Sequence, residues 1–66
     1  MQLTVTEALD TSPNAIVGWW TSEDGSGSLD MTGATVAEAV AELTERACSS
    51  DTDVAAIMSG TLEILD

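Results

Sequence analysis

An amphipathic segment between residues 35 and 48 is the feature that most narrows the folds open to this chain. Thr35 and Glu38 have the T-x-x-E spacing of a capping box, in which each side chain bonds a free backbone amide at the start of a helix. Apolar residues then recur at the spacing of one helical face, at Val36, Val40, Leu43 and Ala47. We therefore predict a helix from Val36 to about Cys48 that packs through this face.

Other parts of the chain alternate between apolar and polar residues, which is the period of a half-buried strand. The turn formers of Asp10–Asn14 are expected to end the first of these elements, and the glycine-rich loop Ser22–Ser28 to join the next two as a hairpin. The predicted strands are residues 1–6, 15–21, 28–32 and 61–64.

Residues Val54–Met58 are compatible with two structures. They could form a helical turn capped by Asp51 or Asp53, or a strand that turns at Ser59-Gly60 into the last strand. The predicted fold is α+β: an antiparallel sheet of four to five strands with one α-helix packed on one face, in the order β-β-β-α-β. A chain of 66 residues is expected to form one compact domain spanning 1–66.

The charge balance is extreme, because twelve acidic residues face a single cationic side chain, Arg46, and the formal net charge is −11. Small domains usually carry a net charge of magnitude about 2 to 8. Self-repulsion of this size opposes folding, so we expect the charge to serve binding to a basic partner. It disfavours direct contact with nucleic acid or an anionic membrane.

Catalysis has little chemical support in this sequence. There is no histidine, and Cys48 has only Arg46 nearby to lower the pKa of its thiol. The acidic loops lack the glycine and glutamate positions of a calcium-binding loop, and no phosphate-binding Gly-Lys-Ser/Thr sequence is present. We therefore predict no enzymatic activity, no metal site and no cofactor. Residues 1–5 do not resemble a signal peptide, and the predicted location is the cytoplasm.

Three glutamates, Glu38, Glu42 and Glu45, fall on the helix face opposite the apolar stripe. Glu38 and Glu42 are separated by about 6 Å along the helix axis. This is of the same order as phosphate spacing on a nucleic-acid strand, which rises about 3.4 Å per nucleotide. Such a row could replace phosphates in front of a basic groove, or it could be the solvated face of an ordinary surface helix. Further carboxylates flank the loops, at Glu23, Asp24, Asp30, Asp51 and Asp53.

Trp19 and Trp20 are adjacent, so on a regular strand they point to opposite faces. One is expected in the core, and the other is either a partner-binding anchor or covered by neighbouring segments. Regular alternation places Ile16, Gly18 and Trp20 on one face, and Val17, Trp19 and Thr21 on the other. The predicted partner-binding residues are both tryptophans and the eight loop and helix carboxylates named above.

In size, acidity and mixed α/β pattern, the chain resembles the small acidic inhibitors carried by phages and mobile elements, among them DNA-mimicking anti-restriction and anti-CRISPR proteins. This resemblance implies an inhibitor that occupies the basic DNA-binding surface of a host defence complex. The sequence is compatible with a monomer or a homodimer. The predicted partner is a basic DNA-binding protein or a subunit of a CRISPR surveillance complex.

Two alternative interpretations remain open. Gly33–Ala39 matches a G-x-T-x-x-E-A stretch and is similar to the helix start of HicB-type antitoxin domains. That similarity implies an antitoxin or small adaptor module that binds a basic protein partner. A halophilic origin would also explain a carboxylate-rich, lysine-free surface, and predicts that the protein unfolds at low salt.

Overall fold

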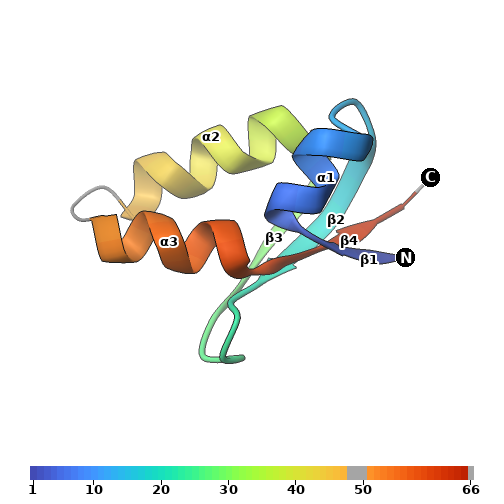
Figure 1. The fold of residues 1–66 in the computed structure, drawn as a ribbon. Helices are drawn as coiled ribbons and strands as arrows, with labels where there is room; N and C mark the ends of the chain where they lie inside the picture. Colours follow the sequence, from blue (N-terminus) through green and yellow to red (C-terminus); the bar gives the residue numbers. More distant parts are fainter. Residues whose placement is uncertain (48–50, 66) are drawn as a thin grey trace.

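A computed structural model describes residues 1–47 and 51–65 of the chain. The elements follow in the order β1 (Gln2–Thr4), α1 (Val5–Thr11), β2 (Ile16–Thr21), β3 (Ser28–Thr35), α2 (Val36–Ala47), α3 (Asp51–Ser59) and β4 (Thr61–Ile64). The strands form one antiparallel sheet in the order β1-β4-β2-β3, and the helices lie together on one side of it (Figure 1). The α+β class and the four-stranded antiparallel sheet are confirmed, whereas the single helix and the element order are wrong.

Helix α1 replaces the end of the predicted first strand. The Thr4 hydroxyl accepts a hydrogen bond from Glu7 N at 3.1 Å, so Thr4 is the N-cap of this helix. Val5 and Ala8, one helical turn apart, are both fully buried. The alternation of residues 1–6 was misleading because Val5 is buried in a strand and in a helix alike. The better signal was Thr4-x-x-Glu7, the same spacing that marks the start of the central helix.

Helix α2 agrees closely with the prediction and begins with a complete capping box. Glu38 N donates to Thr35 Oγ1 at 3.3 Å, and Thr35 N donates to Glu38 Oε1 at 3.4 Å. The apolar stripe faces the core, with Val36 and Leu43 buried and Val40 half-buried. The side chain of Ala47, and Cys48 as a whole, lie outside the described residues.

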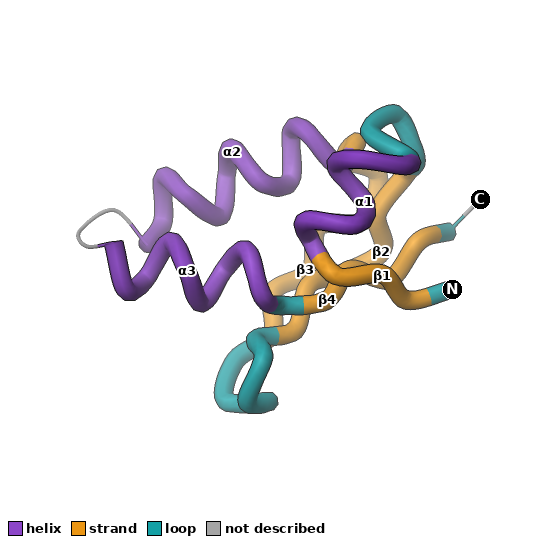
Figure 2. Tube along the Cα trace, viewed as in Figure 1, coloured by secondary structure: helices purple, strands orange, loops and turns teal. Residues whose placement is uncertain are grey.

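Helix α3 decides between the two predictions for Val54–Met58: the segment is helical, and Ser59-Gly60 forms no hairpin turn. The chain enters β4 directly after Gly60 (Figure 2). At this point the end of α3 meets the start of α1 and the end of β2. Gly60 O accepts a hydrogen bond from Val5 N at 2.9 Å. A Cβ atom at Gly60 would overlap the Trp20 indole nitrogen and approach Thr21 O to 2.7 Å, so only glycine fits here without displacement.

A bulge in β2 changes which residues share a face. Val17 and Trp19 lie opposite the consecutive β4 residues Ile64 and Glu63, so Gly18 is an extra residue relative to β4. Val17 is fully buried and Trp19 is 48% exposed, although regular alternation would put both on one face. The predicted division of β2 into faces is therefore wrong.

The core lies between the sheet and the helices. Its largest fully buried side chains are Leu62, Val5, Val17 and Val36, contributed by four different elements. Within the described part of the chain no polar or charged side chain is buried. None of the described helices combines the length and apolarity needed to cross a membrane.

Candidate binding surfaces

The sheet face that the helices leave uncovered carries a row of residues across all four strands. Glu63 of β4 lies opposite Gln2 of β1 on one side and Trp19 of β2 on the other, and Trp19 in turn lies opposite Asp30 of β3. Directly opposed residues of antiparallel strands have Cβ atoms only about 4.5 to 5.5 Å apart. Trp19 thus has an acidic residue opposite it on each neighbouring strand. We call this surface, with its row Gln2, Glu63, Trp19 and Asp30, the open sheet face.

The open sheet face is hollowed beside Trp19. The hollow has a volume of about 290 Å³, and its lining comes from Gly18, Trp19, Asp30, Thr32, Glu63 and Leu65. We call it the Trp19 hollow. The bulge places Gly18 in it, and the Leu65 side chain lies over that glycine, where its Cδ2 atom would be 3.0 Å from an added Cβ.

Asp30 is fixed in place by Thr32. Thr32 N donates to Asp30 Oδ1 at 2.9 Å. The Thr32 hydroxyl contacts the same Asp30 oxygen. It also lies 2.6 Å from Gly18 O. The hydrogen bond from the Thr32 hydroxyl, followed by that from its amide, lowers the pKa of Asp30 below the ordinary 3.8. Asp30 therefore presents a charged, oriented carboxylate, and the same threonine ties β3 to the bulge of β2.

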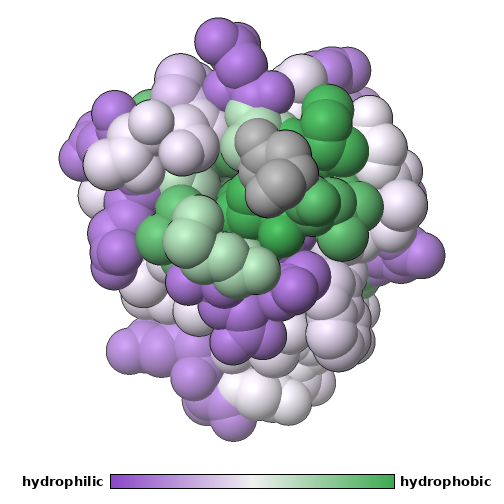
Figure 3. Space-filling view, turned by 90° about the vertical axis from the view of Figure 1, so that its right-hand side faces the viewer, coloured by the Kyte–Doolittle hydropathy of each residue, from purple (hydrophilic) through white to green (hydrophobic). Residues whose placement is uncertain are grey.

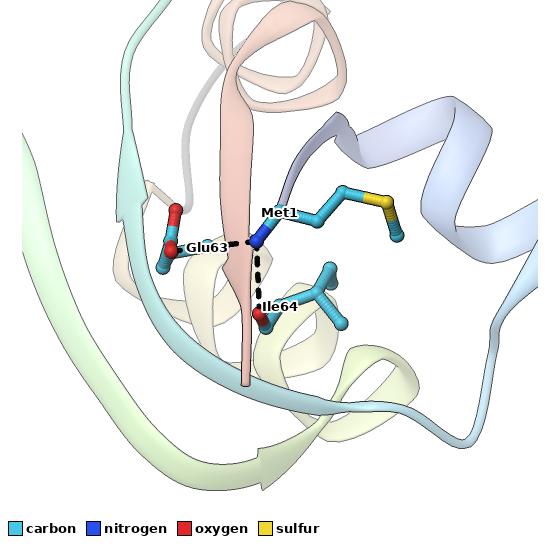
Figure 4. Close-up of polar contacts among 3 residues, drawn as sticks. All are labelled: Met1, Glu63 and Ile64. Atoms are coloured by element: carbon cyan, nitrogen blue, oxygen red, sulfur yellow. Dashed lines mark hydrogen bonds and ion pairs between the residues drawn. The ribbon is translucent and has the colours of Figure 1, made fainter. Parts of the chain in front are cut away.

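Glu63 already has one cation beside it. The N-terminal ammonium lies 3.6 Å from Glu63 Oε1 and donates to Ile64 O at 3.3 Å (Figure 4). About a third of the Glu63 side chain is still exposed, so the ammonium does not cover it. The carboxylate therefore lies between the N-terminus and the Trp19 hollow.

Apolar side chains border this region at the end of the molecule where both termini lie. Figure 3 views that end and shows several apolar side chains gathered on it. Leu65 is 54% exposed, and its amide donates to Ile16 O at 2.9 Å, which brings the exposed Ile16 beside it. Trp20, in contrast, is half-buried against the core, and its indole nitrogen donates to Ile57 O at 3.4 Å. Of the tryptophan pair, Trp19 is the exposed member.

The three glutamates of α2 form a second surface, which we call the outer helix face: Glu38, Glu42 and Glu45. All three are exposed, on the side of α2 that faces away from the sheet. Glu42 Oε1 pairs with Arg46 at 2.9 Å, and Glu38 Oε1 accepts from the Thr35 hydroxyl at 2.9 Å. Two of the three carboxylates are thereby held by neighbours that lie in α2 or directly before it.

The loop between β2 and β3 holds its acidic residues in defined positions. Asp24 Oδ1 accepts from Ser26 N at 2.8 Å and from the Ser22 hydroxyl at 3.0 Å. Hydrogen bonds from the Ser26 side chain and amide, and then from Ser22, lower the pKa of Asp24. Glu23 Oε2 accepts from the Ser59 hydroxyl at 3.0 Å, so the loop is connected to the end of α3.

The predicted partner-binding residues do not form one surface. Trp19 and Asp30 lie on the open sheet face, whereas the outer helix face points to the opposite side of the molecule, with Glu23 and Asp24 at the loop. The side chains of Asp51 and Asp53 lie outside the described residues. Sequence reasoning missed Glu63, Thr32 and Leu65, because only strand register brings them beside Trp19.

No three described acidic or cysteine side chains gather as metal ligands would. No protein-family model matches the chain, and comparisons with curated proteins and with solved structures found no match.

Proposed function

We propose that the protein is a non-catalytic acidic inhibitor that binds the basic DNA-binding surface of a host defence protein in the cytoplasm and blocks its access to DNA. The DNA-recognising part of a CRISPR surveillance complex is the proposed partner. One observation carries the proposal: every described carboxylate lies at the surface, while the single cationic side chain, Arg46, is paired with Glu42. A basic groove that approaches the protein is therefore attracted by a negative electrostatic potential.

The carboxylates are also preorganised. The outer helix face has the fixed geometry of a helix. Asp24 is oriented by hydrogen bonds within its loop, and Asp30 by a hydrogen bond from Thr32 of the same strand. Side chains that are ordered before binding lose less conformational entropy in the complex. A rigid array of this kind is a better substitute for a phosphate backbone than the same charges on a flexible segment would be.

The test is competition between the protein and target DNA for the purified defence complex, over a range of salt concentrations. We expect saturating protein to displace DNA, with an affinity that falls as salt rises. Glu42→Lys with Glu45→Lys should weaken inhibition. Glu7→Lys with Asp10→Lys makes the same charge change on exposed residues of α1 and should weaken it less. A partner that binds DNA normally at saturating inhibitor would contradict the proposal.

One observation favours a second candidate, a small adaptor or antitoxin-like module. The most exposed tryptophan lies on the open sheet face, away from the outer helix face. If a bound partner keeps its DNA-binding activity and Trp19→Leu abolishes the complex, the adaptor function is the correct one. A halophilic domain would instead unfold in low-salt buffer and gain stability in molar salt, which circular dichroism would detect without any partner.

A further inference from the structure

We propose that the Trp19 hollow binds an arginine side chain of the partner protein. This inference rests on the proposed function in one respect, that the partner is basic. It adds the chemical group that is recognised, and it places that recognition on the open sheet face, away from the outer helix face.

The geometry suits a guanidinium group. Trp19 is 48% exposed and has a carboxylate directly opposite it on each neighbouring strand, Glu63 and Asp30. A cation near the face of an indole is attracted by the ring, and a planar guanidinium can stack there while its donors reach carboxylates at its edges. Few other groups use an aromatic surface and two flanking acceptors at once.

The hollow is at the small end of binding-pocket sizes, which is compatible with a single side chain as the occupant. Pockets for drug-sized ligands usually measure about 300 to 1,000 Å³, and this hollow, at about 290 Å³, lies just below that range. Leu65 provides an apolar border against which the methylene stem of an arginine can pack. The opening on an uncovered sheet face leaves room for the backbone of a partner.

The negative charge around the hollow excludes anionic ligands. The chain has a formal net charge of −11. Asp30 is ionised at neutral pH, since hydrogen bonds hold its pKa below an ordinary value, 3.8, that is already far below neutrality. An anionic ligand would be repelled. Between the two cationic side chains, arginine is favoured over lysine because guanidinium is flat, less strongly hydrated and able to bond a carboxylate through two donors.

The first experiment uses the wild-type protein and a blocked tripeptide, N-acetyl-Gly-Arg-Gly-amide, titrated at low ionic strength. The two indole N–H signals in a ¹H–¹⁵N NMR spectrum are the readout. The Trp19 signal should shift saturably, and the Trp20 signal, whose N–H bonds to Ile57 O, should remain in place as an internal reference. The citrulline tripeptide, which is nearly isosteric but neutral, should not bind, and the lysine tripeptide should bind more weakly.

Variants then locate the binding. Trp19→Leu should weaken arginine binding by about threefold to fivefold, the value of an exposed cation–π contact. Asp30→Asn with Glu63→Gln should weaken it by about twofold to fivefold for each charge pair lost. Glu7→Gln with Asp10→Asn removes the same total charge from α1 and should leave arginine binding unchanged. Equal binding of the citrulline peptide, or an equal loss in the α1 control, would overturn the inference.

The two proposals fail separately. If the arginine tripeptide does not bind and Glu42→Lys with Glu45→Lys still weakens competition with DNA, only the arginine site is wrong. If the tripeptide binds as expected and DNA competition is absent, the arginine site stands and the inhibitor function is wrong.

Discussion

The outer helix face and the open sheet face carry similar chemistry but differ in how they are built. The outer helix face is local: its glutamates lie within two turns of one helix, and their partners Thr35 and Arg46 belong to or adjoin the same helix. The open sheet face is assembled from four strands, and its central row joins residues up to 61 positions apart, Gln2 and Glu63. The first surface depends only on the helix that carries it, whereas the second exists only when the four strands pair in this register.

The largest expected effect is on the free energy of unfolding, and it compares two leucines near the C-terminus. Leu62 of β4 is fully buried in the core between sheet and helices, and Leu65 is 54% exposed beside the hollow. Leu62→Ala should lower the free energy of unfolding by about 2 to 5 kcal/mol, because it loses buried apolar surface and leaves a cavity. Leu65→Ala should cost less than about 1 kcal/mol. Urea denaturation followed by circular dichroism measures both, and similar losses would show that the open sheet face is covered.

A smaller loss of stability is expected when a methyl group is added at Gly60, where α3 meets β4. Gly60→Ala forces the added methyl group against Thr21 O and the Trp20 indole, and should cost about 1 to 3 kcal/mol. Gly27→Ala is the matched control, because an added Cβ there meets nothing within 4 Å. Thermal unfolding of the two variants is the measurement. Equal melting temperatures would mean that the close approach at Gly60 is absent in solution.

Charge removal on the outer helix face should have a small effect of the opposite sign. Glu38→Gln with Glu45→Gln retains a residue suited to the capping box while relieving repulsion among carboxylates. We expect the free protein to be unchanged or slightly more stable at low salt, with any gain shrinking as salt is added. Marked destabilisation at low salt would show that these glutamates are structural. Chemical denaturation at two salt concentrations distinguishes these results.

The smallest effect concerns the pH response of the open sheet face. Because the pKa of Asp30 is lowered in the folded state, its contribution to stability is present above the ordinary value of 3.8 and is lost as pH falls through the folded pKa. Thr32→Val removes the hydroxyl hydrogen bond and should raise the pKa of Asp30 toward 3.8. NMR titration of the Asp30 carboxyl carbon checks this, and an unchanged midpoint would exclude Thr32 as the cause.

Features that depend on near neighbours in sequence were predictable. The capping box of α2, its buried stripe and the Glu42–Arg46 pair all join residues within one or two turns, and all three are confirmed for the side chains that the structure describes. Thr4 and Glu7 of helix α1 have the same spacing, but the period-2 alternation of residues 1–6 also fits a strand, so the sequence pattern does not distinguish the two structures.

The sequence by itself determined the surface charge and the position of α2, since both follow from composition and short-range spacing. Only the tertiary structure decided which tryptophan is exposed. The bulge at Gly18 reverses the faces of β2, and it arises from the pairing of β2 with β4, more than 40 positions away in the chain. The Trp19 hollow has the same origin. Strand register depends on which distant segments pack together, and no periodicity within a single segment encodes that choice.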